Sequence, residues 1–340
     1  MRQPAQERNA EWVRAALQQA VLLELATLPP YLCGLWSVNT TSGPVRRTLR
    51  RIVFDEMSHL GIACNLLTTV DGTPLLTGEA LVPTYPGPLP GGVRPGLTVF
   101  LSGLTTHSVT MYAAIEEPDH PLPPALPPAQ RAEASYTSIG AFYTAVLDAL
   151  SAQPQLITGH RQVIRDMSHH GEGNSLDPLN TLDDVKAAIR VVKEQGEGTS
   201  ATPENPFPDG DGSGELAHYY AFREILRAHE LSDPPLGPDE WNFPTFPMGG
   251  VPAGGWPRED PTTPAVIELL DEFNRAYSGV LSLLEQAWKQ VDAEQAAIRL
   301  DDAVTKMFEL RSPARELMQT PLPHHGGKNY GPEFRYTDTF

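Results

Sequence analysis

Residues 54–67 read FDEMSHLGIACNLL. The apolar residues of this stretch repeat at the i, i+3, i+4 spacing of a buried helix, yet Glu56 and His59 lie in the same stripe. A buried acid and a buried imidazole one helical turn apart carry a desolvation cost unless they bind something between them. The stretch therefore predicts a helix that holds a ligand, such as a metal ion, on its inner face.

The same E-x-x-H spacing returns in residues 214–231, GELAHYYAFREILRAHEL, as Glu215 and His218. Glu24 lies on the apolar stripe of the first predicted helix. Residues i and i+3 of a helix point to the same side, so each Glu/His pair can offer an oxygen and a nitrogen to one ion. Two such helices, with a Glu from each of two others, make the di-iron or di-manganese site of ferritin-like bundles. The chain supplies five of these six positions, and three converging carboxylates would repel one another without a cation.

Hydrophobic periodicity predicts an all-α fold made of one domain over residues 1–340. We expect a four-helix bundle with long Pro/Gly-rich loops and extra carboxy-terminal helices; Pro29 and Pro30 should bend or interrupt the first helix. Strand-like sequence is confined to residues 73–103. The expected core helices cover about 9–38, 43–70, 129–150 and 213–231, and the additional helices cover about 104–117, 182–196, 263–292 and 297–320.

Composition excludes several classes of function. The formal charge of −17 and the scattered Lys and Arg residues argue against a nucleic-acid partner, which requires a basic face. No apolar run approaches the roughly 20 residues of a membrane span, and the first residues do not resemble a signal peptide, so we expect a cytoplasmic protein with no membrane partner. Two cysteines, Cys33 and Cys64, exclude a disulfide framework and a Cys-rich zinc site.

Several stretches in order along nearly the whole chain are similar to a known family. They include LLELATLPPYLCGLWSV, DEMSHLGIACNLLTTVDGTP, SIGAFY, EQGEGT, ELAHYYAFREI and MFELRSPARELMQTPL. The chain resembles ferritin-like proteins related to the ferritin-like domain of iminophenyl-pyruvate dimer synthases, which act in violacein-type and rebeccamycin-type pathways. The resemblance implies a four-helix metal core whose ligands are Glu24, Glu56, His59, Glu215 and His218.

One position departs from the family pattern. Where relatives read SIGEFY, this chain reads SIGAFY over residues 138–143, so Ala141 replaces the carboxylate of the third helix. Three consequences are open for the second metal: a free coordination position for dioxygen or substrate, a site too weak to hold the ion, or a ligand supplied by another residue. Asp148 lies about 10 Å further along the helix, which is too far. The candidate substitutes, in order of preference, are Glu116, Glu117 and Glu197.

The leading functional hypothesis is a non-haem iron carboxylate oxidoreductase, with one or two iron ions or with manganese. A His/carboxylate shell with open positions suits these metals. The family resemblance implies that the protein would use dioxygen to tailor an amino-acid-derived small molecule in specialised metabolism. The alternative is a non-catalytic metal-binding scaffold or partner module of a biosynthetic enzyme, and iron storage ranks third. A homodimer or a complex with a partner biosynthetic enzyme is compatible with either of the first two hypotheses. The residues alone assign no catalytic group.

Overall fold

The computed structural model describes residues 3–118, 136–168, 174–199, 202–204, 215–258, 264–323 and 326–338. In these ranges the regular structure is helical, and the β-bridges are isolated pairs such as Gly87–Val99 and Val93–Tyr136. The α-helices are α1 (Ala10–Ser37), α2 (Pro44–Thr69), α3 (Thr106–Ile115), α4 (Ile139–Ser151), α5 (Leu182–Glu197), α6 (His218–Glu230), α7 (Pro264–Lys289), α8 (Ala293–Glu309) and α9 (Arg311–Leu317). Short 3-10 helices are η1 (Ala5–Glu7), η2 (Pro90–Gly92) and η4 (Pro154–Leu156).

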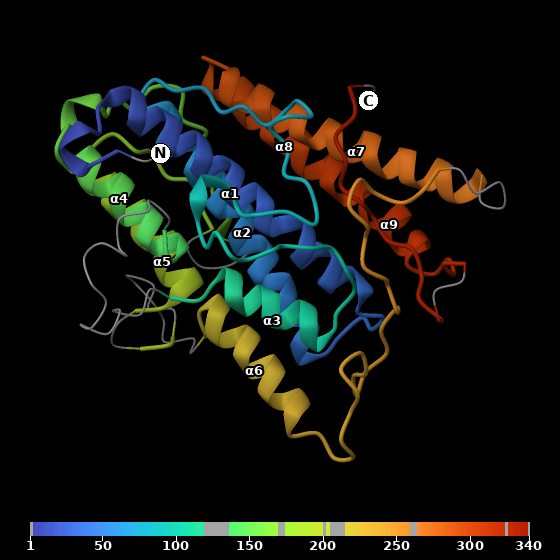
Figure 1. Ribbon diagram of the computed structural model, residues 1–340. Coiled ribbons are helices and arrows are strands. Elements are labelled where there is room, and N and C mark those ends of the chain that lie inside the picture. Colours follow the sequence, from blue (N-terminus) through green and yellow to red (C-terminus); the bar gives the residue numbers. More distant parts are fainter. Residues whose placement is uncertain are drawn as a thin grey trace.

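The long helices α1 and α2 pack along each other at the centre of the molecule (Figure 1). On one side of this pair lie two further pairs, α3 with α6 and α4 with α5. On the other side α7 packs against both α8 and α9, which places the carboxy-terminal helices across the central pair from α4 and α5 (Figure 1). The central helices therefore have one inner face toward α3–α6 and another toward α7–α9.

Helix α1 runs through Pro29 and Pro30 instead of ending there. A proline has no N–H, so Pro30 leaves the carbonyl of Ala26 without its helical donor. The Tyr85 hydroxyl donates to this carbonyl at 2.8 Å and supplies the missing hydrogen bond inside the core. The segment around Tyr85 thus satisfies a carbonyl that Pro30 leaves free, two residues after the buried acid Glu24.

The observed helices differ from the expected ones at three places. The expected helix at 297–320 is two helices, α8 and α9, that meet at Leu310. Residues 129–135 of the expected third core helix lie outside the described residues, and α4 begins at Ile139. Helix α6 begins at His218 and not near 213, because residues 216–217 pair with residues 203–204: Leu216 bridges Glu204, and the Ala217 amide donates to the Pro203 carbonyl at 3.1 Å.

Among the described residues, α1 is the helix that is long and apolar enough to cross a membrane by length and composition. Its whole apolar window is buried inside the protein. A helix buried at the core of a globular fold passes the same test, because it too is apolar on every side. We therefore assign α1 to the core.

Candidate metal centre

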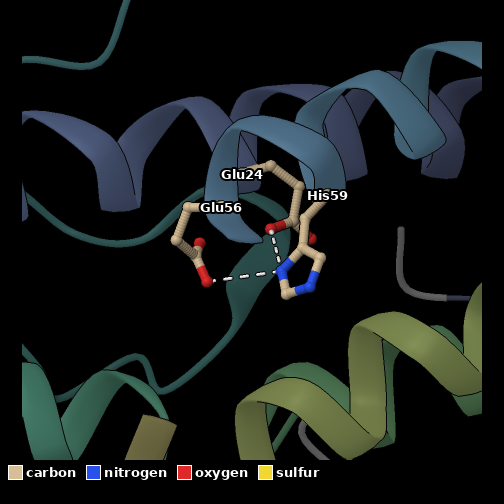
Figure 2. A group of neighbouring side chains, drawn as sticks. All are labelled: Glu24, Glu56 and His59. Atoms are coloured by element: carbon tan, nitrogen blue, oxygen red, sulfur yellow. Dashed lines mark ion pairs between the residues drawn. The ribbon is translucent and has the colours of Figure 1, made fainter. Parts of the chain in front are cut away.

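Glu24, Glu56 and His59 meet on the inner face of the central pair (Figure 2). Glu24 comes from α1, and Glu56 and His59 come from adjacent turns of α2. The Nδ1 atom of His59 lies 3.3 Å from Glu56 Oε1 and 3.9 Å from Glu24 Oε2. All three side chains are buried, so their ligand atoms lie inside the protein and away from bulk solvent.

Glu56 also belongs to a second group, with Glu116 and His218. Glu116 follows the last residue of α3, and His218 is the first residue of α6. The Nδ1 atom of His218 lies 3.0 Å from Glu56 Oε1 and 3.9 Å from Glu116 Oε2, yet it is buried and has no hydrogen-bond partner. The two groups thus share Glu56, and the two imidazole rings stack with centroids 5.6 Å apart.

A hydroxyl group holds one oxygen of each carboxylate. Tyr143 donates to Glu24 Oε1 at 2.6 Å, Thr27 donates to Glu56 Oε2 at 2.5 Å, and Tyr31 donates to Glu116 Oε1 at 2.6 Å. In each case the other oxygen is the one that approaches a histidine Nδ1 atom. The three hydroxyls therefore fix the carboxylates with a free oxygen directed to the centre.

The two histidines are oriented in the same way, each through its Nε2 atom. His59 Nε2 lies 2.7 Å from the amide oxygen of Gln195 on α5, and His218 Nε2 lies 3.1 Å from Asp55 Oδ2. Asp55 is itself held by Arg51 at 3.1 Å. An oxygen acceptor at Nε2 places a proton there and leaves Nδ1 to bind a metal, which is the usual outer arrangement of metal-binding histidines.

Burial and neighbouring charges shift the pKa of each group in the absence of a cation. Burial and then the charge of Glu56 raise the pKa of Glu24 to about 7 and that of Glu116 to about 8. Burial opposes the ionisation of Glu56, but His59 and His218 outweigh it and hold the pKa of Glu56 below its ordinary range. Burial opposes protonation of both imidazoles, yet their acidic neighbours raise the pKa of His59 to about 9 and that of His218 to about 10. Protons thus balance the acids where no cation is present.

These residues fit a pair of transition-metal ions. Three carboxylates and two imidazoles form the mixed oxygen and nitrogen donor set that suits iron and manganese. The Nδ1 atom of His218 is the clearest sign: it is buried and lies 3.0 Å from Glu56 Oε1 without forming a hydrogen bond, whereas buried polar atoms are almost always hydrogen-bonded. A cation between Glu56, Glu116 and His218 could be coordinated by this nitrogen and would offset the charge of both acids.

The structure brings together four of the five predicted ligands, Glu24, Glu56, His59 and His218, and leaves Glu215 outside both groups. Glu215 precedes α6, so it does not share a helical face with His218. Its side chain is 47% exposed and lies 3.7 Å from the Nε atom of Arg51.

Among the candidate substitutes, Glu116 reaches the centre and the other two lie outside both groups. Glu117 is 40% exposed and pairs with Arg94 at 2.8 Å, while Glu197 accepts the Gly140 amide at 2.6 Å. Ala141 precedes Tyr143 by two residues, about 200° around α4. Position 141 therefore lies on a different side of α4 from Tyr143, whose hydroxyl reaches Glu24.

Sequence reasoning missed four residues that orient the candidate ligands: Thr27, Tyr31, Asp55 and Gln195. A signal existed for two of them. Thr27 and Tyr31 follow Glu24 by three and seven residues, so they share its face of α1. Gln195 and Asp55 offered no such signal, since their role depends on how α5 and α6 pack against α2.

Comparison with known proteins agrees with this architecture. The ferritin-like family model matches residues 17–227. A solved ferritin-like protein from Caulobacter vibrioides superposes with a TM-score of 0.65 over 96% of this chain and 97% of its own, at 20% identity. That likeness shows the fold alone.

Dichlorochromopyrrolate synthase from Lentzea aerocolonigenes is 25% identical over 94% of this chain. The match covers 35% of that relative, so this chain spans about a third of its length. The family match takes in most of α1, all of α2 to α5 and most of α6, and with them both groups of candidate metal-binding side chains. The chain belongs to the ferritin-like family.

Proposed function

We propose that the protein is a non-haem oxidoreductase that holds two iron or manganese ions and uses dioxygen to modify an amino-acid-derived small molecule. Glu24, Glu56 and His59 would hold one ion, and Glu56, Glu116 and His218 would hold the other. The observation that carries the proposal is the sharing of Glu56 between two buried groups, each with an imidazole nitrogen directed at it. The biosynthetic relative supports a substrate from specialised metabolism.

The bound ions would supply dioxygen activation and one-electron chemistry at this point. The protein side chains would keep the centre dry and the ligands in place. Tyr143, Thr27 and Tyr31 would restrain the carboxylates, while Gln195 and Asp55 would keep both imidazoles turned toward Glu56. Burial strengthens these interactions, because the low-dielectric interior of a protein screens the attraction between polar groups less than water does.

The test combines metal analysis with oxygen uptake. Protein loaded anaerobically with Fe(II) should bind two ions per chain, consume dioxygen on exposure to air, and consume more with its substrate, sought among amino acids and their 2-oxo derivatives. Glu56→Ala should bind neither ion tightly and lose the uptake. Folded wild-type protein that binds no stoichiometric iron or manganese would refute the proposal, as would a Glu56→Ala variant that binds metal equally well.

A second candidate function is a metal-bearing module that supports a separate biosynthetic enzyme. It is favoured by one observation, namely that this chain matches about a third of a longer synthase. In that case the metal would bind as above, but the isolated chain would show no substrate-dependent oxygen uptake. Turnover by the chain alone would rule this function out.

A further inference from the structure

A cavity of about 210 Å³ lies on the other inner face of the central helices, toward α7, α8 and α9. Its walls are mainly apolar and include Leu28, Trp36, Leu281, Leu284 and Trp288. An apolar cavity of about 150 Å³ is large enough to hold benzene, so this one has room for a somewhat larger apolar group. Exposed residues Arg50, Phe308 and Arg311 mark its outer end.

Unpartnered polar atoms gather at this cavity. Ser58 Oγ, Asn174 Oδ1 and the Tyr277 hydroxyl are buried and lack a hydrogen-bond partner, and all three residues line it. The residues are 4%, 1% and 4% exposed. Orphaned buried polar groups are rare because each costs about 1–3 kcal/mol. Three of them around one apolar space indicate a site built for a molecule that carries polar groups.

Positive charge is concentrated at the same cavity, in a chain whose net charge is −17. Arg46, Arg50 and Arg311 line it, and none of them forms an ion pair with any described acid. The Nη1 atom of Arg46 is also buried and unpartnered. Partial burial, and then Arg311 and Arg50, lower the pKa of Arg46. An anion at this end of the cavity would relieve that repulsion.

We infer that this cavity is a binding site for a small amphipathic anion, a molecule with an apolar aromatic or acyl body and a carboxylate. The body fills the space between the central helices and α7–α8. The carboxylate pairs with Arg46, and any further polar group on the body can bond to Ser58, Asn174 or Tyr277.

This site is separate from the metal centre, although the same helices form both. On α2 the cavity is lined by Met57, Ser58 and Gly61, while Glu56 and His59 face the other way. One chain of contacts joins the two sites, since Asn174 of the cavity donates to Asp55 Oδ1 at 2.9 Å and Asp55 orients His218. The inference stands on the cavity alone and does not require the proposed function.

The test is isothermal titration calorimetry of the chain of residues 1–340 with matched probes: 2-naphthoate, its neutral analogue 2-naphthamide, and decanoate. We expect 2-naphthoate or decanoate to bind at one site per chain, and the tighter of these two shows whether the body is aromatic or acyl. Arg46→Leu should weaken binding of the carboxylate about 10- to 100-fold, as expected for loss of a charge-assisted hydrogen bond. The same change should leave the weaker binding of 2-naphthamide nearly unaltered.

Two variants serve as controls. Arg47→Leu removes the neighbouring arginine of α2, which is exposed and does not line the cavity, and it should bind 2-naphthoate like the wild type. Tyr277→Phe removes one orphaned hydroxyl, so it should raise the melting temperature of the free protein. Failure of both carboxylates to bind at millimolar concentration would overturn the inference, as would equal binding of 2-naphthoate and 2-naphthamide or equal effects of Arg46→Leu and Arg47→Leu.

Discussion

Glu285 of α7 fastens the loop at residues 75–77 to the carboxy-terminal helices, and its removal should destabilise the fold. Glu285 Oε2 accepts hydrogen bonds from the Leu76 amide at 2.7 Å, the Thr77 amide at 2.9 Å and the Thr77 hydroxyl at 2.8 Å. Lys289 donates to the other oxygen at 2.5 Å. The loop that Glu285 holds continues to Tyr85, whose hydroxyl satisfies the carbonyl that Pro30 leaves free.

The magnitude follows from these contacts. Glu285 is 6% exposed and Leu76 is 0% exposed, so Glu285→Ala leaves at least one amide buried without a partner. An orphaned buried donor costs about 1–3 kcal/mol, and each hydrogen bond to a charged group contributes about 1.5–3 kcal/mol. We therefore expect Glu285→Ala to lower the free energy of unfolding by about 3–5 kcal/mol at pH 7, and Glu268→Ala, at an exposed site of α7, by less than about 0.5 kcal/mol.

The loss should depend on pH in a defined direction. Burial opposes ionisation of Glu285, but Lys289 and the amides of Leu76 and Thr77 outweigh it and hold the pKa of Glu285 below its ordinary value. A carboxyl whose pKa is lower in the folded state contributes its full stabilisation of the fold at pH values above its unfolded pKa, which is about 4.3 for glutamate. It loses this contribution as the pH falls through the pKa of the folded state. The stability difference between wild type and Glu285→Ala should thus be constant near neutrality and shrink below about pH 4.3.

Urea denaturation followed by circular dichroism between pH 3.5 and 7 measures this difference. Comparison of wild type, Glu285→Ala and Glu268→Ala at each pH removes the general effect of acid on the fold. A Glu285→Ala variant as stable as Glu268→Ala would refute the reasoning. So would a large difference that does not change with pH, since this would show that the charge of Glu285 plays no part.

Two further predictions concern the surroundings of the candidate metal centre. Tyr143→Phe removes the hydroxyl that holds Glu24 Oε1, so metal affinity measured by competition with a chelator should fall about 10- to 100-fold while the circular dichroism spectrum is retained; an unchanged affinity would contradict this role. Gly34→Ala would place a methyl carbon 2.8 Å from the Tyr112 hydroxyl, which donates to the Pro30 carbonyl. Displacement of this buried ring should outweigh the better helix propensity of alanine. It should lower the free energy of unfolding by about 1–2 kcal/mol and the melting temperature by several degrees; an equal or higher melting temperature would show that the ring moves freely.

The helices were predictable where the apolar period of one segment decided the outcome. Helices α1, α2, α5 and α7 lie within a few residues of their expected ranges, and the Glu56–His59 pair faces inward as its spacing predicts. Local signals sufficed there, because each of these helices carries a sustained apolar stripe and begins at a recognisable turn.

Glu215 lies outside both candidate metal-binding groups, although the spacing of its motif predicts a metal ligand. Its E-x-x-H spacing is the same as that of Glu56, but residues 216–217 pair with residues 203–204. Helix α6 therefore begins at His218, three residues after Glu215. Glu116 has no helical motif, and it reaches His218 because α3 packs beside α6. Both outcomes depend on contacts between distant segments, which the spacing of a single stretch does not contain.

Metal stoichiometry distinguishes Glu116 from Glu215 as the residue that completes the second group, and it shows whether two ions share Glu56. Wild type, Glu116→Ala and Glu215→Ala are loaded with Mn(II) under identical conditions, desalted, and analysed by inductively coupled plasma mass spectrometry. We predict two ions per chain for wild type and for Glu215→Ala, and one for Glu116→Ala. Loss of an ion in Glu215→Ala with full occupancy in Glu116→Ala would contradict the account.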